Sequence, residues 1–123
     1  LEELNYGNKI IGDNITDFWL DESLKITAYG QIEFLKRLYK NDLPFKIENI
    51  DALKEIMIDE KTNDYIIRAK TGWEGKYGWY VGYIETKNDV YFFATNINTK
   101  SKDDLAKRKK ITLEALKIKG VIK

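Results

Sequence analysis

This sequence predicts an α/β fold of the α+β kind, with helices first, then a three-stranded antiparallel meander, then a C-terminal helix. Two observations carry the prediction. Apolar residues first recur at helical spacing, and from residue 64 their period changes to two. Three strand-like runs then follow one another with only short turns between them. Strands connected so closely are antiparallel, because a parallel pair needs a long crossover.

The first part of the chain contains little regular structure. Residues 1–8 fit the end of a helix, and residues 9–22 fit a loop, because a glycine, an aspartate and an asparagine follow one another there. The loop contains the apolar group 18–20, Phe-Trp-Leu, which core packing alone would explain. A short element is expected at residues 23–27.

Two helices are expected next. Thr27 is suited to cap a helix over about residues 28–40, and the single proline, Pro44, lies in the turn after it. A second helix covers about residues 48–58. We expect the apolar residues at helical spacing in these segments to pack in the core, namely Ile32, Leu35, Leu38, Tyr39, Ile50, Leu53, Ile56 and Met57.

The meander and the last helix complete the chain. Strands are expected at residues 64–71, 77–86 and 90–97, with a Lys-Asn-Asp turn before the third. The last helix begins at Lys102 and runs to about residue 118, with acidic residues near its start and lysines near its end, as the helix dipole prefers. Three strands with one helical layer on each side make a small core. The pattern therefore suggests the second half of an α/β sandwich.

Composition excludes several kinds of function. A formal net charge of +1 indicates no strong attraction to nucleic acid, and no apolar run approaches the ~20 residues that span a bilayer. The chain has no cysteine and no histidine, which excludes thiol nucleophiles, disulfides, zinc sites and a Ser-His-Asp triad. Its two serines, Ser23 and Ser101, have no lysine three residues on, so no serine–lysine nucleophile is present.

The end of the first strand carries the clearest candidate binding site. Residues 69–73 read Ala-Lys-Thr-Gly-Trp. Lysine offers a point charge, threonine a hydroxyl group, and glycine lets another backbone come close. Together these residues predict a shelf for an anionic, peptide-like ligand. The alternative is a strand edge whose lysine is merely solvated.

Several motifs, in their order and spacing, resemble the C-terminal half of class D β-lactamases, the serine enzymes of the penicillin-recognising fold. The resemblance covers essentially the whole chain. It rests on these stretches: Tyr6-Gly7-Asn8, Phe18-Trp19-Leu20, SLKIT leading into the QIEFLKRLY helix, Lys70-Thr71-Gly72, the strands WYVGYIE and VYFFATNI, and Arg108 in the last helix.

The resemblance implies a β-lactamase/transpeptidase-like fold and an incomplete active site. The Ser-x-x-Lys and Ser-x-Val motifs of the family are absent, so residues 1–123 are expected to form the C-terminal part of one such domain. The implied reaction is hydrolysis of the amide of penicillin-type β-lactams through an acyl-serine, with a CO2-derived lysine carbamate as general base and no metal. Serine and base would lie in an N-terminal segment. The implied location is exported: periplasmic, cell-surface or secreted.

Individual residues take roles by the same resemblance. Trp19 would donate its indole N–H to the carbamate, and Leu20 would keep the base dry. Lys70 would anchor the substrate and assist proton transfer. Tyr6 and Asn8 would line the opposite wall. The substrate-binding residues would be Thr71 for the carboxylate, Gly72 for close approach of the substrate backbone, Trp73 through its backbone N–H as an oxyanion donor, and Arg108 for the carboxylate.

Two other readings stay open at this stage. The β-lactam sensor domain of membrane receptors shares the fold and most of these motifs, but it is acylated without turnover. Arg108 and the Phe18–Leu20 group favour the lactamase. A third reading is an interaction module that retains the motifs without chemistry. For Arg108 itself the alternative role is a solvated helix face, because three lysines surround it: Lys107, Lys109 and Lys110.

Overall fold

The computed structural model describes residues 27–123 and contains the predicted types of element in the predicted order. The predictions for residues 1–26 lie outside the described residues. The elements are helices α1 (Ala28–Tyr39) and α2 (Ile47–Ile56), strands β1 (Ile58–Lys61), β2 (Tyr65–Trp73), β3 (Tyr77–Thr86) and β4 (Val90–Asn98), a short 3-10 helix (Lys102–Asp104), and helix α3 (Ala106–Ile118). No helix within residues 27–123 is long and apolar enough to cross a membrane.

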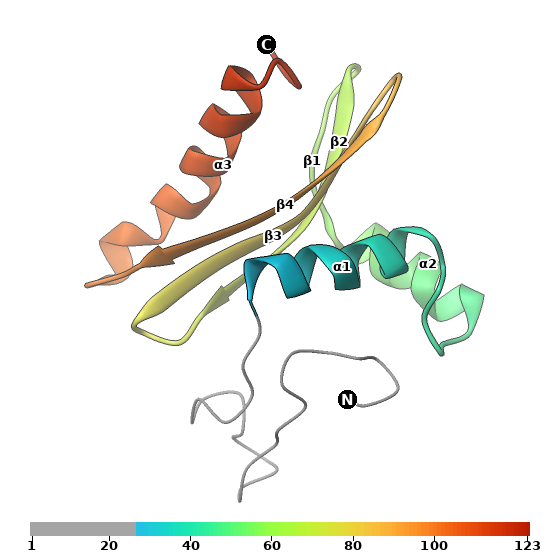
Figure 1. Cartoon of the computed structure of the whole chain (residues 1–123), viewed down its shortest axis with the longest axis horizontal. Coiled ribbons are helices and arrows are strands. Elements are labelled where there is room, and N and C mark those ends of the chain that lie inside the picture. The colour runs from blue at the N-terminus through green and yellow to red at the C-terminus, as the bar shows by residue number, and fades with distance from the viewer. Residues whose placement is uncertain (1–26) are drawn as a thin grey trace, which may run out of the picture.

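Helices cover both faces of one antiparallel sheet, whose strand order is β1-β2-β3-β4. Helix α3 lies on one face, and α1 and α2 lie toward the other (Figure 1). Two apolar clusters correspond to these layers. Leu38, Ile50 and Tyr83 belong to the α1/α2 side, whereas Ile67 and Leu116 belong to the α3 side. Because strand residues alternate between the faces, this division tells which face each later residue of β2 occupies.

The sequence-based prediction missed the first strand. It placed residues up to 58 in a helix, but α2 ends at Ile56 and β1 pairs with β2. The sheet thus has four strands, and the predicted three-stranded meander is confirmed as its β2–β4 part. Four residues are too few to establish a period of two in sequence. The strand forms because β2 supplies backbone partners: the Ala69 N–H, for example, donates to the Met57 carbonyl oxygen at 2.8 Å.

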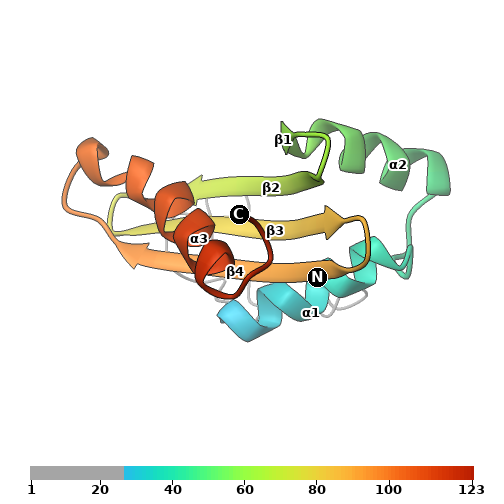
Figure 2. The same ribbon diagram turned by 90° about the horizontal axis from the view of Figure 1, so that it is seen from above.

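The expected apolar face of the second helix is only half buried. Ile50 and Met57 are in the core. Within the described part of the chain, Leu53 and Ile56 are 42% and 80% exposed to solvent. The last helix also differs from expectation, since residues 102–104 form a 3-10 turn before α3 begins. The α2 difference follows from its position beyond the end of the sheet (Figure 2), where fewer of the described elements can cover the helix.

Thr27 begins α1 as predicted, with its hydroxyl oxygen accepting a hydrogen bond from the Gly30 N–H at 3.0 Å. We expect Thr27→Ala to lower the free energy of unfolding by about 0.5–2 kcal/mol, because one N–H of the first helical turn loses its partner. Urea denaturation measures the change. Thr27→Ser keeps the hydroxyl and is the matched control; equal losses in the two variants would contradict the capping role.

Candidate functional site

The second half of β2 is an open sheet edge among the described residues. Strand β1 pairs with β2 only from Ile66 to Arg68, and Figure 2 shows it beside the first half of β2 alone. Since the Ala69 N–H points to this outer edge and the pattern alternates, the backbone N–H and C=O groups of Thr71 and Trp73 point there too. The edge therefore offers backbone donors and acceptors to an extended ligand.

The side chains of Lys70 and Thr71 lie on opposite faces of that edge. Ile67 and Ala69 pack in the α3-side cluster with Leu116, so Thr71 is on the α3 side and Lys70 on the other. Lys70 is exposed, and its Nζ donates to the Thr71 carbonyl oxygen at 2.6 Å. Within residues 27–123 no carboxylate pairs with it. Its positive charge is thus available at the edge.

Arg108 is held over the end of β2 rather than on a solvated helix face. Its Nη1 donates to the Gly72 carbonyl oxygen at 3.0 Å, and its Nε donates to the Leu105 carbonyl oxygen at 2.9 Å. The stem passes over Gly78, where an added β-carbon would lie 3.0 Å from the Arg108 Cδ. The described residues place no carboxylate in ion-pairing range of this guanidinium. An anionic ligand at the edge would therefore meet an unneutralised arginine.

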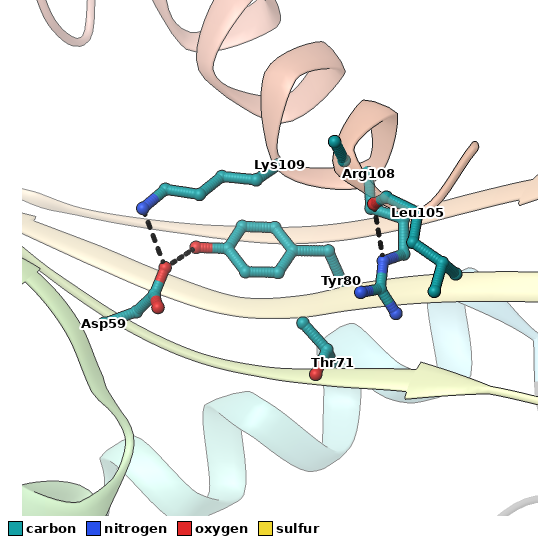
Figure 3. Close-up of a pocket in the computed structure, with 7 residues that line it drawn as sticks. Asp59, Thr71, Tyr80, Leu105, Arg108 and Lys109 are labelled. Carbon is teal, nitrogen blue, oxygen red and sulfur yellow. Dashed lines mark hydrogen bonds and ion pairs between the residues drawn. The ribbon is translucent and has the colours of Figure 1, made fainter. Parts of the chain in front are cut away.

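Thr71 and Arg108 share one cavity of about 230 Å³ between β2, β3 and the start of α3. Figure 3 shows the two side chains beside each other at one end and a polar cluster at the other. The labelled lining residues are Asp59, Thr71, Tyr80, Leu105, Arg108 and Lys109. The structure thus brings together two residues that are 37 positions apart in sequence and that were both predicted to bind a carboxylate.

The polar cluster consists of Asp59, Tyr80 and Lys109. The Asp59 Oδ2 accepts a hydrogen bond from the Tyr80 hydroxyl at 2.5 Å and lies 3.1 Å from the Lys109 Nζ. The Tyr80 hydrogen bond keeps the pKa of Asp59 below its usual range, against the opposing effect of burial and with help from Lys109. Desolvation would lower the pKa of Lys109, but the hydrogen bond and charge of Asp59, with Glu60, raise it overall. At neutral pH the carboxylate and the ammonium are both charged.

Sequence reasoning missed this cluster. Asp59 lies in the unpredicted strand, and Lys109 was considered only as one of the lysines around Arg108. Lys109 instead reaches the sheet, where its Nζ also lies 3.5 Å from the Glu60 carboxylate. No signal in the sequence pairs residues 50 positions apart. The position of Lys109 directly after Arg108 is the one feature of the sequence that could have suggested Lys109 as a residue of the site.

The Trp73 side chain is held at the end of β2 by its indole N–H. The Trp73 Nε1 donates to the Thr99 Oγ1 at 3.0 Å, and that hydroxyl donates to the Gly75 carbonyl oxygen at 2.9 Å. Gly75 has φ of +92°, which suits the turn between β2 and β3. Trp73 is not among the described residues that line the cavity. Its anchorage to Thr99 fixes the strand end from which the Trp73 backbone N–H points to the open edge.

The fold itself does not require glycine at position 72. Among the described residues, a β-carbon there would meet the Trp79 Cβ at 3.6 Å and nothing nearer, which is ordinary contact, and φ is not in the left-handed region. A residue without a side chain at the open edge is suited to close approach of a ligand backbone.

The remaining predicted site residues cannot be placed in this geometry. Tyr6, Asn8, Trp19 and Leu20 lie outside the described residues. In the part that is described, no three residues among aspartate and glutamate gather closely enough to hold a metal ion.

The comparisons with known proteins agree with the fold. Residues 1–117 match the family described as the penicillin binding protein transpeptidase domain, and the chain belongs to that family. Its similar relatives are class D β-lactamases. It is 47% identical to β-lactamase OXA-20 of Pseudomonas aeruginosa over 112 residues, which are 90% of this chain and 42% of that relative. The resemblance inferred from the motifs is confirmed.

Solved structures give the same result. A class D β-lactamase from Nostoc superposes with a TM-score of 0.92 at 46% identity, over 97% of this chain and 52% of the other. The class D β-lactamase FUS-1 (OXA-85) of Fusobacterium nucleatum subsp. polymorphum superposes with a TM-score of 0.93 at 44% identity. This match covers 100% of this chain and 53% of the other. The chain spans about half the length of the relatives and structures that it matches.

Proposed function

We propose that residues 1–123 are the C-terminal part of a class D serine β-lactamase domain and supply its substrate-binding edge. One observation carries this proposal. The second half of β2 pairs with β3 but has an outer edge without a strand partner among the described residues. Thr71 and Arg108 lie on one side of this edge and Lys70 on the other, with backbone groups pointing outward between them. An edge of this kind fits a flat, anionic, amide-containing ligand.

In this proposal the chain binds and orients the β-lactam. Arg108 holds the ligand carboxylate with the fork of its guanidinium, and the Thr71 hydroxyl donates a further hydrogen bond to it. Gly72 lets the ring system lie against the strand. The Trp73 N–H donates to the oxygen that becomes negative when the amide is attacked. Lys70 supplies positive charge beside the reacting serine.

The nucleophile and base would come from an N-terminal segment of the same domain. The base of this enzyme class is a lysine carbamate, formed with CO2, that activates first the serine and then water. In this chain Trp19 would donate to that anion and Leu20 would exclude water from it, while Tyr6 and Asn8 would line the facing wall. An exported location, periplasmic or at the cell surface, follows from the same proposal because the target antibiotics act there.

A complementation experiment tests the proposed division of the site. We expect the 123-residue chain alone to leave a chromogenic cephalosporin intact, because it lacks a serine–lysine pair. Joining it to the N-terminal segment, or adding that segment as a second chain, should give turnover. Hydrolysis is followed by absorbance, and mass spectrometry follows the acyl-enzyme. Robust turnover by the isolated chain would overturn the proposal, and a permanent acyl-enzyme in the joined protein would favour the sensor domain.

A further inference from the structure

The cavity that holds Thr71 and Arg108 also has an anionic wall. Asp59 lines it directly and is ionised at neutral pH, and the Glu60 carboxylate pairs with the same lysine, Lys109. A ligand carboxylate bound by Arg108 would therefore face a second carboxylate across a space of about 230 Å³. Repulsion at that range opposes binding unless a cation neutralises the charge of the wall.

Lys109 is that cation. Its Nζ lies 3.1 Å from the Asp59 carboxylate and 3.5 Å from that of Glu60. The formal charges of Asp59, Glu60, Lys109 and Arg108 sum to zero, and without Lys109 the sum is negative. Arg68 of β2 cannot replace Lys109, because the Arg68 side chain lies on the opposite face of the sheet and pairs there with Glu85 and Glu55.

We propose that Lys109 determines the preference of the Arg108 cavity for anionic β-lactams by neutralising Asp59 and Glu60. The inference rests on the proposed function of the edge and names a residue that the sequence motifs do not assign. In Figure 3 the Lys109 side chain extends from α3 along the cavity to Asp59, on the far side of Tyr80 from Arg108. Lys109 thus lines the same cavity and acts on a carboxylate held by Arg108 through the charge balance of the wall.

Lys107 provides a matched control on the same helix. It also sits beside Arg108 and also forms an ion pair, with the Asp104 Oδ1 at 2.8 Å. That pair stays within one turn of chain at the solvent side and does not reach the sheet. Removing either lysine takes one positive charge from the helix. A difference in KM between the two variants therefore measures the effect of the charge at the cavity wall.

The experiment compares benzylpenicillin with its methyl ester in the complete protein. For Lys109→Met we expect KM for the acid to rise about 5–30-fold. This is the fold-change that corresponds to the Coulomb repulsion of two unit negative charges about one cavity width apart, at an effective dielectric constant of about 20–40. The ester should change less than about twofold, and kcat should change little, since the wall does not touch the reacting amide. Lys107→Met should have the wild-type KM for both substrates. Lys109→Arg, which keeps the positive charge, should have a KM for the acid close to that of the wild type.

A double variant separates charge from fastening of the helix. Asp59→Asn combined with Lys109→Met has the same formal charge as wild type, so KM for the acid should return to within about threefold of it. If Lys109 only fastens α3 to the sheet, the double variant will stay as impaired as Lys109→Met and the ester will suffer equally, which would overturn the proposal. Asp59→Asn alone, which keeps a hydrogen-bonding side chain, should lower KM for the acid; an unchanged or higher value also counts against it.

Equilibrium binding separates this inference from the proposed catalytic function. Calorimetry with the ring-opened penicilloate, which keeps the thiazolidine carboxylate, needs no turnover. If the wild type binds it in a Lys109-dependent manner but hydrolyses no β-lactam, the charge inference stands and the lactamase proposal falls. If the wild type hydrolyses penicillin and neither KM nor penicilloate binding depends on Lys109, the inference falls and the lactamase proposal stands.

Discussion

Replacing Lys70 by alanine in the complete protein should lower kcat/KM for penicillins by about 10²–10³, the scale seen when a preorganised electrostatic contact is lost from a transition state. Lys70 is exposed at the open edge and has no ion-pair partner within residues 27–123. Its removal should therefore cost little stability. Steady-state kinetics and urea denaturation on the same samples measure both effects, with exposed Lys61 of β1 replaced as the control.

Arg108→Ala should have a smaller effect that falls mainly on KM. A charge-assisted contact is worth about 1.5–3 kcal/mol, or roughly 10–150-fold. Because Arg108 also donates to the Gly72 and Leu105 carbonyl oxygens, some of this effect is structural. Arg108→Lys keeps the charge but loses the fork and should recover only part of it. If the Lys70 and Arg108 variants both match wild type, the substrate shelf proposed for residues 69–73 is wrong.

Two glycines of the sheet should respond to alanine in opposite ways. At Gly82 a β-carbon would collide with the Arg68 carbonyl oxygen and lie 2.7 Å from the Ala69 Cα, both backbone atoms that cannot move aside. We expect Gly82→Ala to lower the free energy of unfolding by about 3 kcal/mol or more, because β2 and β3 must separate there. Denaturant titration of the complete protein measures this loss.

Gly72→Ala is the functional counterpart. Since the fold accommodates a β-carbon at position 72, stability should change by less than about 1 kcal/mol and is expected to rise slightly. The proposed ligand backbone, however, loses its close approach, so kcat/KM should fall about tenfold or more. Full activity in Gly72→Ala would show that the edge does not hold the ligand as proposed. Equal stability of the two variants would contradict the packing described for Gly82.

Much of the architecture could be predicted from local sequence. The change from helical to alternating period located β2, β3 and β4 to within two residues at each end, and Thr27 marked the start of α1. These features depend on neighbours a few positions apart. Strand β1 could not be predicted in this way. Its four residues become a strand through the backbone of β2, and its irregular register between residues 58 and 60 comes from that pairing.

The candidate site divides in the same way. Residues 70–72 and Arg108 could be chosen by motif, because the residue types themselves suit anion recognition. The sequence by itself thus determined the family, the helices, three of the four strands, and the side chains that we propose for binding. Only the tertiary structure decided that Lys70 and Thr71 lie on opposite faces of an open edge, that Arg108 rests on the Gly72 carbonyl oxygen, and that Lys109 reaches Asp59. The Arg108 and Lys109 contacts join residues 36 or more positions apart. Their energies depend on burial and on a charge balance that exist only once α3 has packed on the sheet.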